Sequence, residues 1–179
     1  VFSRKGSNCN HGDRRMSKIY VDEIAGIASP STVAIPGHVI QVVRGGGSTR
    51  AYVSTDTITR VGDTVSITPT SSTSKILITG SATLRWASGD AGITALHRQI
   101  DAGSWSEIKI FSRHTMYRNF DTANTSGQFV SYTYLDTPST TGVVTYSWAM
   151  NRFTSGTAQF NPNGDTNDTL NWVLMEIAG

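Results

Sequence analysis

Cysteine, charge and long apolar runs are all scarce in this chain of 179 residues. The one cysteine, Cys9, cannot form an internal disulfide, and from Met16 onward the chain has neither disulfides nor thiolate chemistry to draw on. Charged residues make up 16% of the chain and hydrophobic residues 37%. No run of about 18 apolar residues occurs, so the sequence predicts no membrane-spanning helix and no membrane insertion.

Basic residues are also scarce outside the first fifteen positions. The formal net charge is +2, yet residues 1–15 alone carry +3, so the rest of the chain carries −1. It therefore lacks the basic face that nucleic-acid binding requires, and no nucleic-acid partner is expected. Residues 1–15 also lack the apolar core of a secretory signal. Because Met16 begins a stretch that looks like a natural start, we interpret residues 1–15 as upstream translated sequence or a flexible arm. A functional basic arm is the alternative.

Serine and threonine, by contrast, fill 45 positions, and glycine fills 17 more. The residues that lose least on entering a helix are few, whereas the β-branched and aromatic residues suit a pleated sheet. The clearest strand is Lys75–Trp86, in which every second residue from Ile76 onward is apolar or small. This period of two is typical of a sheet with one face in the core and one face towards solvent.

Ten strand candidates follow one another at the spacing of an all-β domain. They are His38–Arg44, Ala51–Arg60, Thr64–Pro69, Lys75–Trp86, Ile93–Asp101, Ser106–Ser112, Gln128–Leu135, Val143–Asn151, Thr157–Phe160 and Thr169–Ile177. We interpret Gly45–Gly47 as a flexible loop and Gly62-Asp63 as a turn between two strands. The pattern predicts an antiparallel β-sandwich or jelly roll.

The sandwich domain is expected to span residues 38–179, after an extended N-terminal segment at residues 16–37. That segment has too few apolar residues to form a stable independent element, and its two prolines favour extended backbone. We therefore expect a docking peptide that anchors the chain to a larger partner through its apolar side chains, Ile19, Val21 and Ile24.

The last strand candidate, Thr169–Ile177, is apolar on both faces. Alternate residues point to opposite sides of a sheet, so both sides of this strand should be covered. The opposite sheet covers one side, and a neighbouring subunit or a helix or loop of the same chain covers the other. The first alternative predicts an oligomer interface formed by Trp172, Val173, Met175 and Ile177.

Residues that carry chemistry do not form a recognisable site in this sequence. The four histidines have no metal-ligand spacing, and nucleophile-elbow and phosphate-loop motifs are absent. The adjacent carboxylates Asp22 and Glu23 lie in the docking peptide, and the aspartates at turns, including Asp101 and Asp136, are expected to cap local backbone. Asn161–Asn167 has alternating oxygen side chains, as in calcium loops, but lacks their glycine and glutamate, so an ordinary turn is favoured. We predict no catalytic residue, no metal site and no cofactor.

Aromatic residues cluster in the second half of the chain. Most are expected in the core or between subunits, but Trp and Tyr on loops also stack on sugar rings. The candidates for such a receptor contact are Trp105, Tyr117 and Phe120. The competing interpretation of Trp105 is a buried core residue.

Three stretches of the sequence carry a resemblance to a known class of protein. They are MSKIYVDEIAG followed by VAIPGHVIQVVR in the first quarter of the chain, ITPTSSTSKILITGSATLRW at residues 67–86, and the closing LMEIAG. A fourth stretch, ALHRQIDAGSW at residues 95–105, fits the strand-and-turn pattern of the same class. In this pattern the chain resembles virion fibre proteins of tailed bacteriophages, notably those that infect marine bacteria. The resemblance covers residues 16–179 and leaves residues 1–15 without a counterpart.

The resemblance implies a β-sandwich, with the jelly roll of tumour-necrosis-factor-like trimers as one form, assembled as a homotrimer. It also implies a non-enzymatic structural role in the virion, as a tail fibre or a capsid decoration protein that contributes to host attachment. Other virion proteins and a host-surface glycan are the partners it suggests. The alternative function is a carbohydrate-binding, lectin-like module or a glycan-degrading tail spike, although the latter would need a carboxylate pair in a groove.

Overall fold

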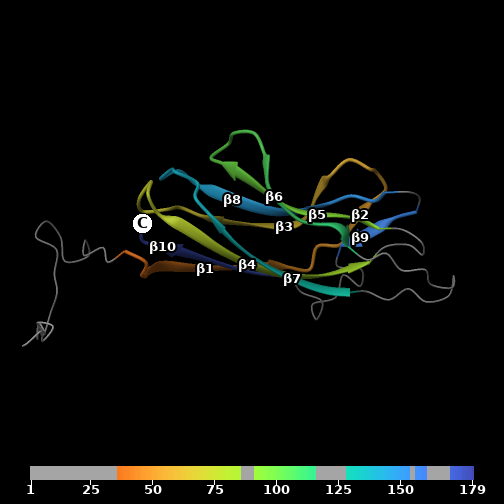
Figure 1. Cartoon of the computed structure of the whole chain (residues 1–179), viewed down its shortest axis with the longest axis horizontal. Coiled ribbons are helices and arrows are strands. Elements are labelled where there is room, and N and C mark those ends of the chain that lie inside the picture. Colours follow the sequence, from red (N-terminus) through yellow and green to blue (C-terminus); the bar gives the residue numbers. More distant parts are fainter. Residues whose placement is uncertain (1–35, 86–90, 116–127, 154–155, 161–169) are drawn as a thin grey trace, which may run out of the picture. The chain divides into compact units, whose positions relative to one another are not determined.

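The computed structural model describes residues 36–85, 91–115, 128–153, 156–160 and 170–179. These ranges contain ten β-strands and no helix (Figure 1). The strands are β1 (Val39–Gly47), β2 (Ala51–Val53), β3 (Thr59–Ile67), β4 (Lys75–Arg85), β5 (Gly92–Ile100), β6 (Ser106–Thr115), β7 (Gln128–Asp136), β8 (Val144–Met150), β9 (Ala158–Phe160) and β10 (Leu170–Ile177).

The strands form two antiparallel sheets that face each other as the layers of a sandwich (Figure 1). Sheet A contains β1, β10, β4 and β7, together with the short strands β9 and β2, and sheet B has the order β3-β8-β5-β6. When the eight longer strands are numbered in sequence, sheet A has the order 1-8-3-6 and sheet B the order 2-7-4-5. This is the strand order of a jelly roll, and it confirms the fold class expected from the sequence.

Two glycine segments differ from the expectation. Gly45–Gly47 is part of β1 and not a flexible loop. A Cβ at Gly45 would lie only 2.6 Å from Cγ2 of Val65, so glycine is the residue that allows β1 to approach β3 so closely. Gly62-Asp63 is an irregularity within β3 and not a turn between strands. The break that was expected there comes earlier in the chain, at residues 54–58 between β2 and β3.

The core lies between the sheets and is rich in aromatic rings. Alternate residues of β4 are buried, as its period of two predicts. The ring of Trp148 lies 5.4 Å from that of Trp172 and 6.5 Å from that of Phe160, measured between centroids. Phe111 of β6 stacks on Tyr132 of β7 at 4.2 Å. Aromatic packing between the sheets therefore accounts for much of the aromatic cluster in the sequence.

Candidate interaction surfaces

The outer face of sheet A carries apolar side chains that run across four strands. Val42, Met175, Leu77 and Leu135 are successive cross-strand neighbours in the register of β1, β10, β4 and β7. They point outward because the residues that alternate with them, such as Ile76, are buried. Val42 is 58% exposed and Leu135 is 47% exposed. We call these four residues the apolar row.

The interface residues expected from the last strand are divided between the two faces of β10. Val173, Met175 and Ile177 are half-buried on the outer face. Trp172 is 1% exposed and packs against Trp148 in the core. The assignment of Trp172 is therefore corrected to a core residue, because alternate side chains of a strand point to opposite faces. The other three residues, on the outer face of β10, remain candidates for the interface.

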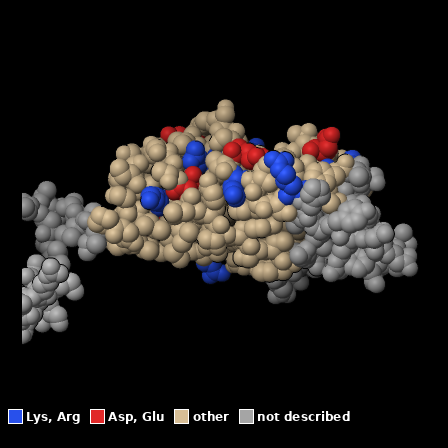
Figure 2. Space-filling model, viewed as in Figure 1, with Lys and Arg blue, Asp and Glu red and all other residues tan. Residues whose placement is uncertain are grey.

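Charged side chains are distributed unevenly over the molecule. On the face seen in Figure 2 most of them lie along the upper half, and the lower half is almost uncharged. In Figure 1 sheet A forms the lower layer in the same view. Among the described residues of β7 and β10, the only charged side chains are Asp136 and Glu176, and both are buried. The outer face of sheet A therefore presents little charge to a neighbouring molecule on these two strands.

Glu176 is a fully buried carboxylate that the sequence analysis did not single out. Its Oε2 accepts a hydrogen bond from Nε2 of Gln41 at 2.6 Å. Its Oε1 accepts two more, from the backbone N–H and the hydroxyl of Thr70, both at 2.7 Å. Burial alone would raise the pKa of Glu176, but the hydrogen bonds together hold that pKa below its ordinary value. Glu176 is therefore a buried carboxylate held in its ionised form.

These hydrogen bonds join the three sequence stretches that carry the resemblance. Gln41, Thr70 and Glu176 belong to three different stretches, far apart in the chain. The strands that the stretches form, β1, β4 and β10, are neighbours in sheet A. The described parts of these stretches therefore form one packed unit, and polar residues within them hold it together.

Trp105, the first candidate receptor contact, is half-buried just before β6. The guanidinium of Arg60 lies 4.3 Å from the centroid of its ring. Arg60 belongs to β3, at the opposite edge of sheet B from β6, so the two side chains meet across the outer face of that sheet. A cation therefore covers one face of the indole. Trp105 is neither the open platform nor the core residue that the sequence left as alternatives.

His97 of β5 lies on the same outer face of sheet B, because its neighbour Leu96 is buried in the core. It is the cross-strand neighbour of Glu107, and its Nε2 is buried without a hydrogen-bond partner. Burial lowers the pKa of His97, Glu107 acts against this shift, and Arg60 adds to it. A lowered pKa leaves the imidazole neutral at pH 7.

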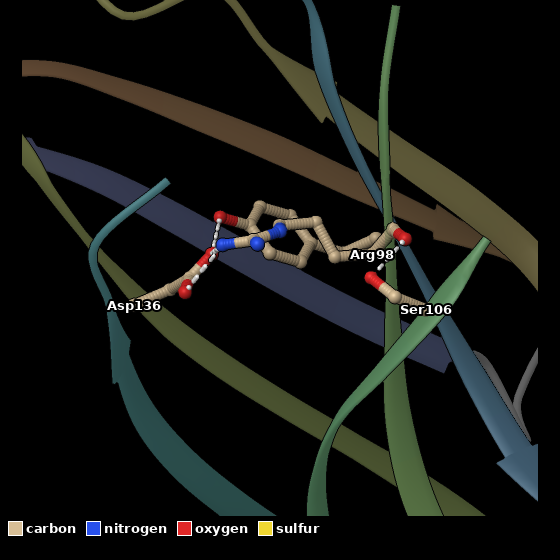
Figure 3. A network of polar contacts seen from close by, with 4 residues as sticks. Arg98, Ser106 and Asp136 are labelled. Carbon is tan, nitrogen blue, oxygen red and sulfur yellow. Dashed lines mark hydrogen bonds and ion pairs between the residues drawn. The ribbon is translucent and has the colours of Figure 1, made fainter. Parts of the chain in front are cut away.

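Asp136 is a second buried carboxylate, and it connects the two sheets. Nη1 of Arg98 in β5 donates to both of its oxygens, at 2.9 and 3.0 Å, and Figure 3 shows the guanidinium directed at Asp136. The hydroxyl of Tyr146 in β8 donates to Oδ2 at 2.8 Å. The prediction that Asp136 caps a local turn is therefore wrong, because its partners come from the opposite sheet. Asp101 does not cap local backbone either, because it accepts a hydrogen bond from the N–H of Val143, which lies 42 positions away.

A shallow depression of about 330 Å³ lies where the loop between β2 and β3 meets the end of β8. Its lining residues are Ser54, Thr55, Asp56, Arg152 and Phe153. Hydroxyl groups, a carboxylate and a guanidinium can hydrogen-bond a polyhydroxylated ligand, and the exposed ring of Phe153 offers an apolar surface beside them. The sequence analysis did not identify this depression, because its residues come from segments nearly one hundred positions apart.

Several expected site residues lie outside the described ranges. They are the anchor residues Ile19, Val21 and Ile24, the receptor candidates Tyr117 and Phe120, and the loop Asn161–Asn167. Within the described ranges, no three His, Cys, Asp or Glu side chains are grouped so that they could hold a metal ion. No helix in this part of the chain is long and apolar enough to cross a membrane.

Comparison with known proteins gives no family for the chain. No family model matches it, and no curated protein matches it. Among solved structures, it is similar to a mutant VP2 protein of infectious bursal disease virus in derived T=1 particles, with 10% identity and a TM-score of 0.41 over 88% of this chain and 41% of that one. A structure of the Gx strain of the same virus gives 11% identity and a TM-score of 0.38 over 92% and 43%. The chain spans less than half the length of either viral chain, and likeness at this level establishes no function.

Proposed function

We propose that the chain is a non-enzymatic structural protein of a virion, of the tail-fibre or capsid-decoration type of tailed bacteriophages. The unit formed by β1, β4 and β10 is the observation that carries this proposal. The described parts of three stretches that resemble phage fibre proteins meet in these neighbouring strands around Glu176, whereas the fourth, at residues 95–105, lies largely in β5 of sheet B. Within the described residues, the resemblance therefore falls mainly on one packed unit of the jelly roll.

The assembly that we propose is a homotrimer whose subunits meet on the outer face of sheet A. Val173, Met175 and Ile177 lie on this face, and Val42 continues it on β1. Exposed apolar side chains that are continuous across neighbouring strands are typical of surfaces that bind another protein. A closed oligomer buries such a face in every copy.

Met175→Glu tests the trimer, because it places a charge in the centre of the proposed interface. We expect native mass spectrometry to find a trimer for the original chain at micromolar concentration and a monomer for the variant, with an unchanged far-ultraviolet spectrum. Lys109→Glu, which changes charge on the exposed side of β6 in sheet B, is the matched control and should leave the trimer intact. A monomeric original chain contradicts the proposed trimer.

Residues 16–37 are the proposed anchor to other virion proteins. Deleting them should leave a folded, cysteine-poor sandwich that no longer joins particles. Particles assembled in cells that produce only the truncated chain are purified and their protein content is measured by mass spectrometry. Normal incorporation of the truncated chain would place the anchor elsewhere.

Location in the virion is tested separately from assembly. Antibodies against the chain should label purified particles in electron micrographs, at the tail for a fibre and over the head for a decoration protein. Recovery of the chain only in the soluble fraction of a lysate, with unlabelled particles, would overturn the virion role itself.

A lectin-like function is the second candidate, and the depression beside Phe153 is the observation that favours it. Host attachment through a glycan could use this depression or the Trp105–Arg60 pair. Phe153→Ala and Trp105→Ala should each reduce binding to host-cell glycans on an array if the corresponding site is used. Tyr52→Ala, which removes an exposed aromatic ring from β2, is the control. Release of reducing sugar from host polysaccharide would instead favour the glycan-degrading spike.

A further inference from the structure

β7 forms one edge of the described part of sheet A. All nine of its residues pair with β4 in an uninterrupted register, from Asp136 opposite Ile76 to Gln128 opposite Leu84. Among the described residues, no other strand pairs with β7. Alternate backbone N–H and C=O groups of β7 therefore point away from the sheet, as a template on which a further strand can pair.

The other long edge strands, β1, β3 and β6, carry features that oppose strand addition, and β7 carries none of them. Natural edge strands are commonly protected by bulges, by proline or by charged side chains, especially lysine. The pairings of β1 and β3 each contain a register irregularity, and the pairing of β6 contains three. These edges also carry exposed basic residues, which are Arg44, Arg60, Lys109 and Arg113.

By contrast, the stretch Gln128–Leu135 contains no proline and no charged residue. The register of β7 has no irregularity. Its one charged residue, Asp136, is 5% exposed and is already paired with Arg98. This edge is therefore long, regular and unprotected.

The outward-facing side chains of β7 are arranged symmetrically about Tyr132. In order they are Phe129, Ser131, Thr133 and Leu135, an apolar–polar–polar–apolar sequence. An antiparallel copy of β7 with Tyr132 opposite itself places Phe129 opposite Leu135 and Ser131 opposite Thr133. Phe129 is 66% exposed and Leu135 is 47% exposed, so this pairing covers two strongly exposed apolar side chains of sheet A. A contact between identical surfaces requires this kind of self-complementarity.

We propose that β7 pairs with β7 of a second copy of this chain, antiparallel and about a two-fold axis at Tyr132, so that two copies of sheet A form one continuous sheet. The contact does not depend on the proposed virion role. β7 and β1 lie on opposite sides of the β10–β4 pair. The edge contact can therefore form together with a trimer contact centred on β10, and we propose the closed arrangement in which all three β7 edges of one trimer pair with those of a second.

A charge-complementation experiment on the full chain tests this contact. The variant S131K/T133K places ammonium groups of the two copies opposite each other, and S131E/T133E does the same with carboxylates, which is destabilising in cross-strand pairs. Both positions are exposed, so neither variant should change the melting temperature by more than a few degrees. Sedimentation velocity should find that each variant has half the assembly mass of the original chain. Mixing the two variants should restore the full mass, because opposite charges then face each other.

The control applies the same chemistry to an edge of the other sheet. T64K/S66K places two lysines at exposed positions of β3 and should leave the assembly mass unchanged. If the assembly mass of T64K/S66K were halved as well, the effect would come from net charge, and the proposal would be overturned. An original chain that never exceeds the mass of the variants, or a mixture that does not recover it, overturns the β7 contact too. Loss of the β7 contact halves the mass whether or not the trimer exists, so the result separates the two contacts. A hexamer becomes a trimer if the trimer exists, and a dimer becomes a monomer if it does not.

Discussion

Asp136 and Glu176 lie in the same inner row of sheet A, but the protein stabilises them differently. Both are register neighbours of Ile76, one on each side of β4, so a single buried side chain separates them. Asp136 has a counter-ion, Arg98, whose side chain is 21% exposed. Glu176 is fully buried and receives its described hydrogen bonds from Gln41 and Thr70, which carry no charge.

The difference follows from what lies opposite each carboxylate. β5 and β8 of sheet B face the end of β7, and they supply a long cationic side chain and a phenol to Asp136. Glu176 is reached by the loop between β3 and β4, which supplies a backbone N–H and a hydroxyl at Thr70. The stability of one site therefore depends chiefly on a single ion pair, and that of the other on several weaker donors.

Arg98→Met should cause the largest loss of stability, because it leaves Asp136 buried without its cation. Removing one partner of a buried ion pair costs about 3–5 kcal/mol, and the partial exposure of Arg98 places the expected loss near the lower value. Urea unfolding, followed by the fluorescence of the buried tryptophans, measures it. Arg113→Met, at an exposed position of β6, is the control. Equal losses in the two variants would mean that water replaces the guanidinium.

Glu176→Gln should cost about 2 kcal/mol at pH 7, because the amide keeps one acceptor oxygen but turns a donor towards Gln41 or Thr70. The folded-state pKa of Glu176 is lowered, so its stabilising contribution is present above the unfolded pKa of about 4.3 and is lost as the pH falls through the folded pKa. The variant should therefore lose stability less steeply than the original chain below about pH 4. Urea unfolding of both proteins at pH 7 and at several acidic pH values measures this difference. An equally steep loss of stability below pH 4 in both would contradict an ionised Glu176 in the folded protein.

Local pattern predicted the strands of this molecule well, and it failed where two segments distant in sequence meet. β4 could be recognised because its period of two is a property of consecutive residues. Gly45 and Gly62 were misjudged because glycine is common in loops, whereas here it permits a close approach to Val65 and an irregularity in β3.

The two carboxylate sites could not be predicted, because their partners are separated from them by up to 135 positions. Asp136 precedes a turn-like Thr-Pro pair and has the local signature of a cap, and Glu176 lies in a run of apolar residues with no local sign of a partner. Asp136 meets its partners only where sheet B packs on sheet A, and Glu176 meets its own only through the pairing of β1 with β10 and the loop between β3 and β4. For the same reason the apolar row became visible only when the strands were placed side by side.

Tyr146→Phe should cost about 1–1.5 kcal/mol, less than the loss of Arg98, because the carboxylate of Asp136 keeps its cation. Burial raises the pKa of the Tyr146 phenol well above its ordinary value, and the neighbouring carboxylate raises it further, so the hydroxyl remains a donor throughout the alkaline range used for unfolding experiments. The loss measured by urea unfolding should therefore be the same at pH 7 and pH 9. A loss that disappears at pH 9 would show that the phenol ionises.

Gln41→Met should have the smallest effect of the four, about 1 kcal/mol at pH 7, because Thr70 still donates two hydrogen bonds to Glu176. The more informative effect of this substitution is on stability at low pH. Gln41 is the first of the donors that lower the pKa of Glu176, so without it that pKa should rise towards its ordinary value. The loss of stability on acidification should then begin at a higher pH than in the original chain. Unfolding free energies measured at half-unit steps of pH between 3 and 6 test this shift, with Ser66→Ala, at an exposed position of β3, as the control. If the free energy of unfolding began to fall at the same pH in both proteins, Thr70 alone would keep Glu176 ionised.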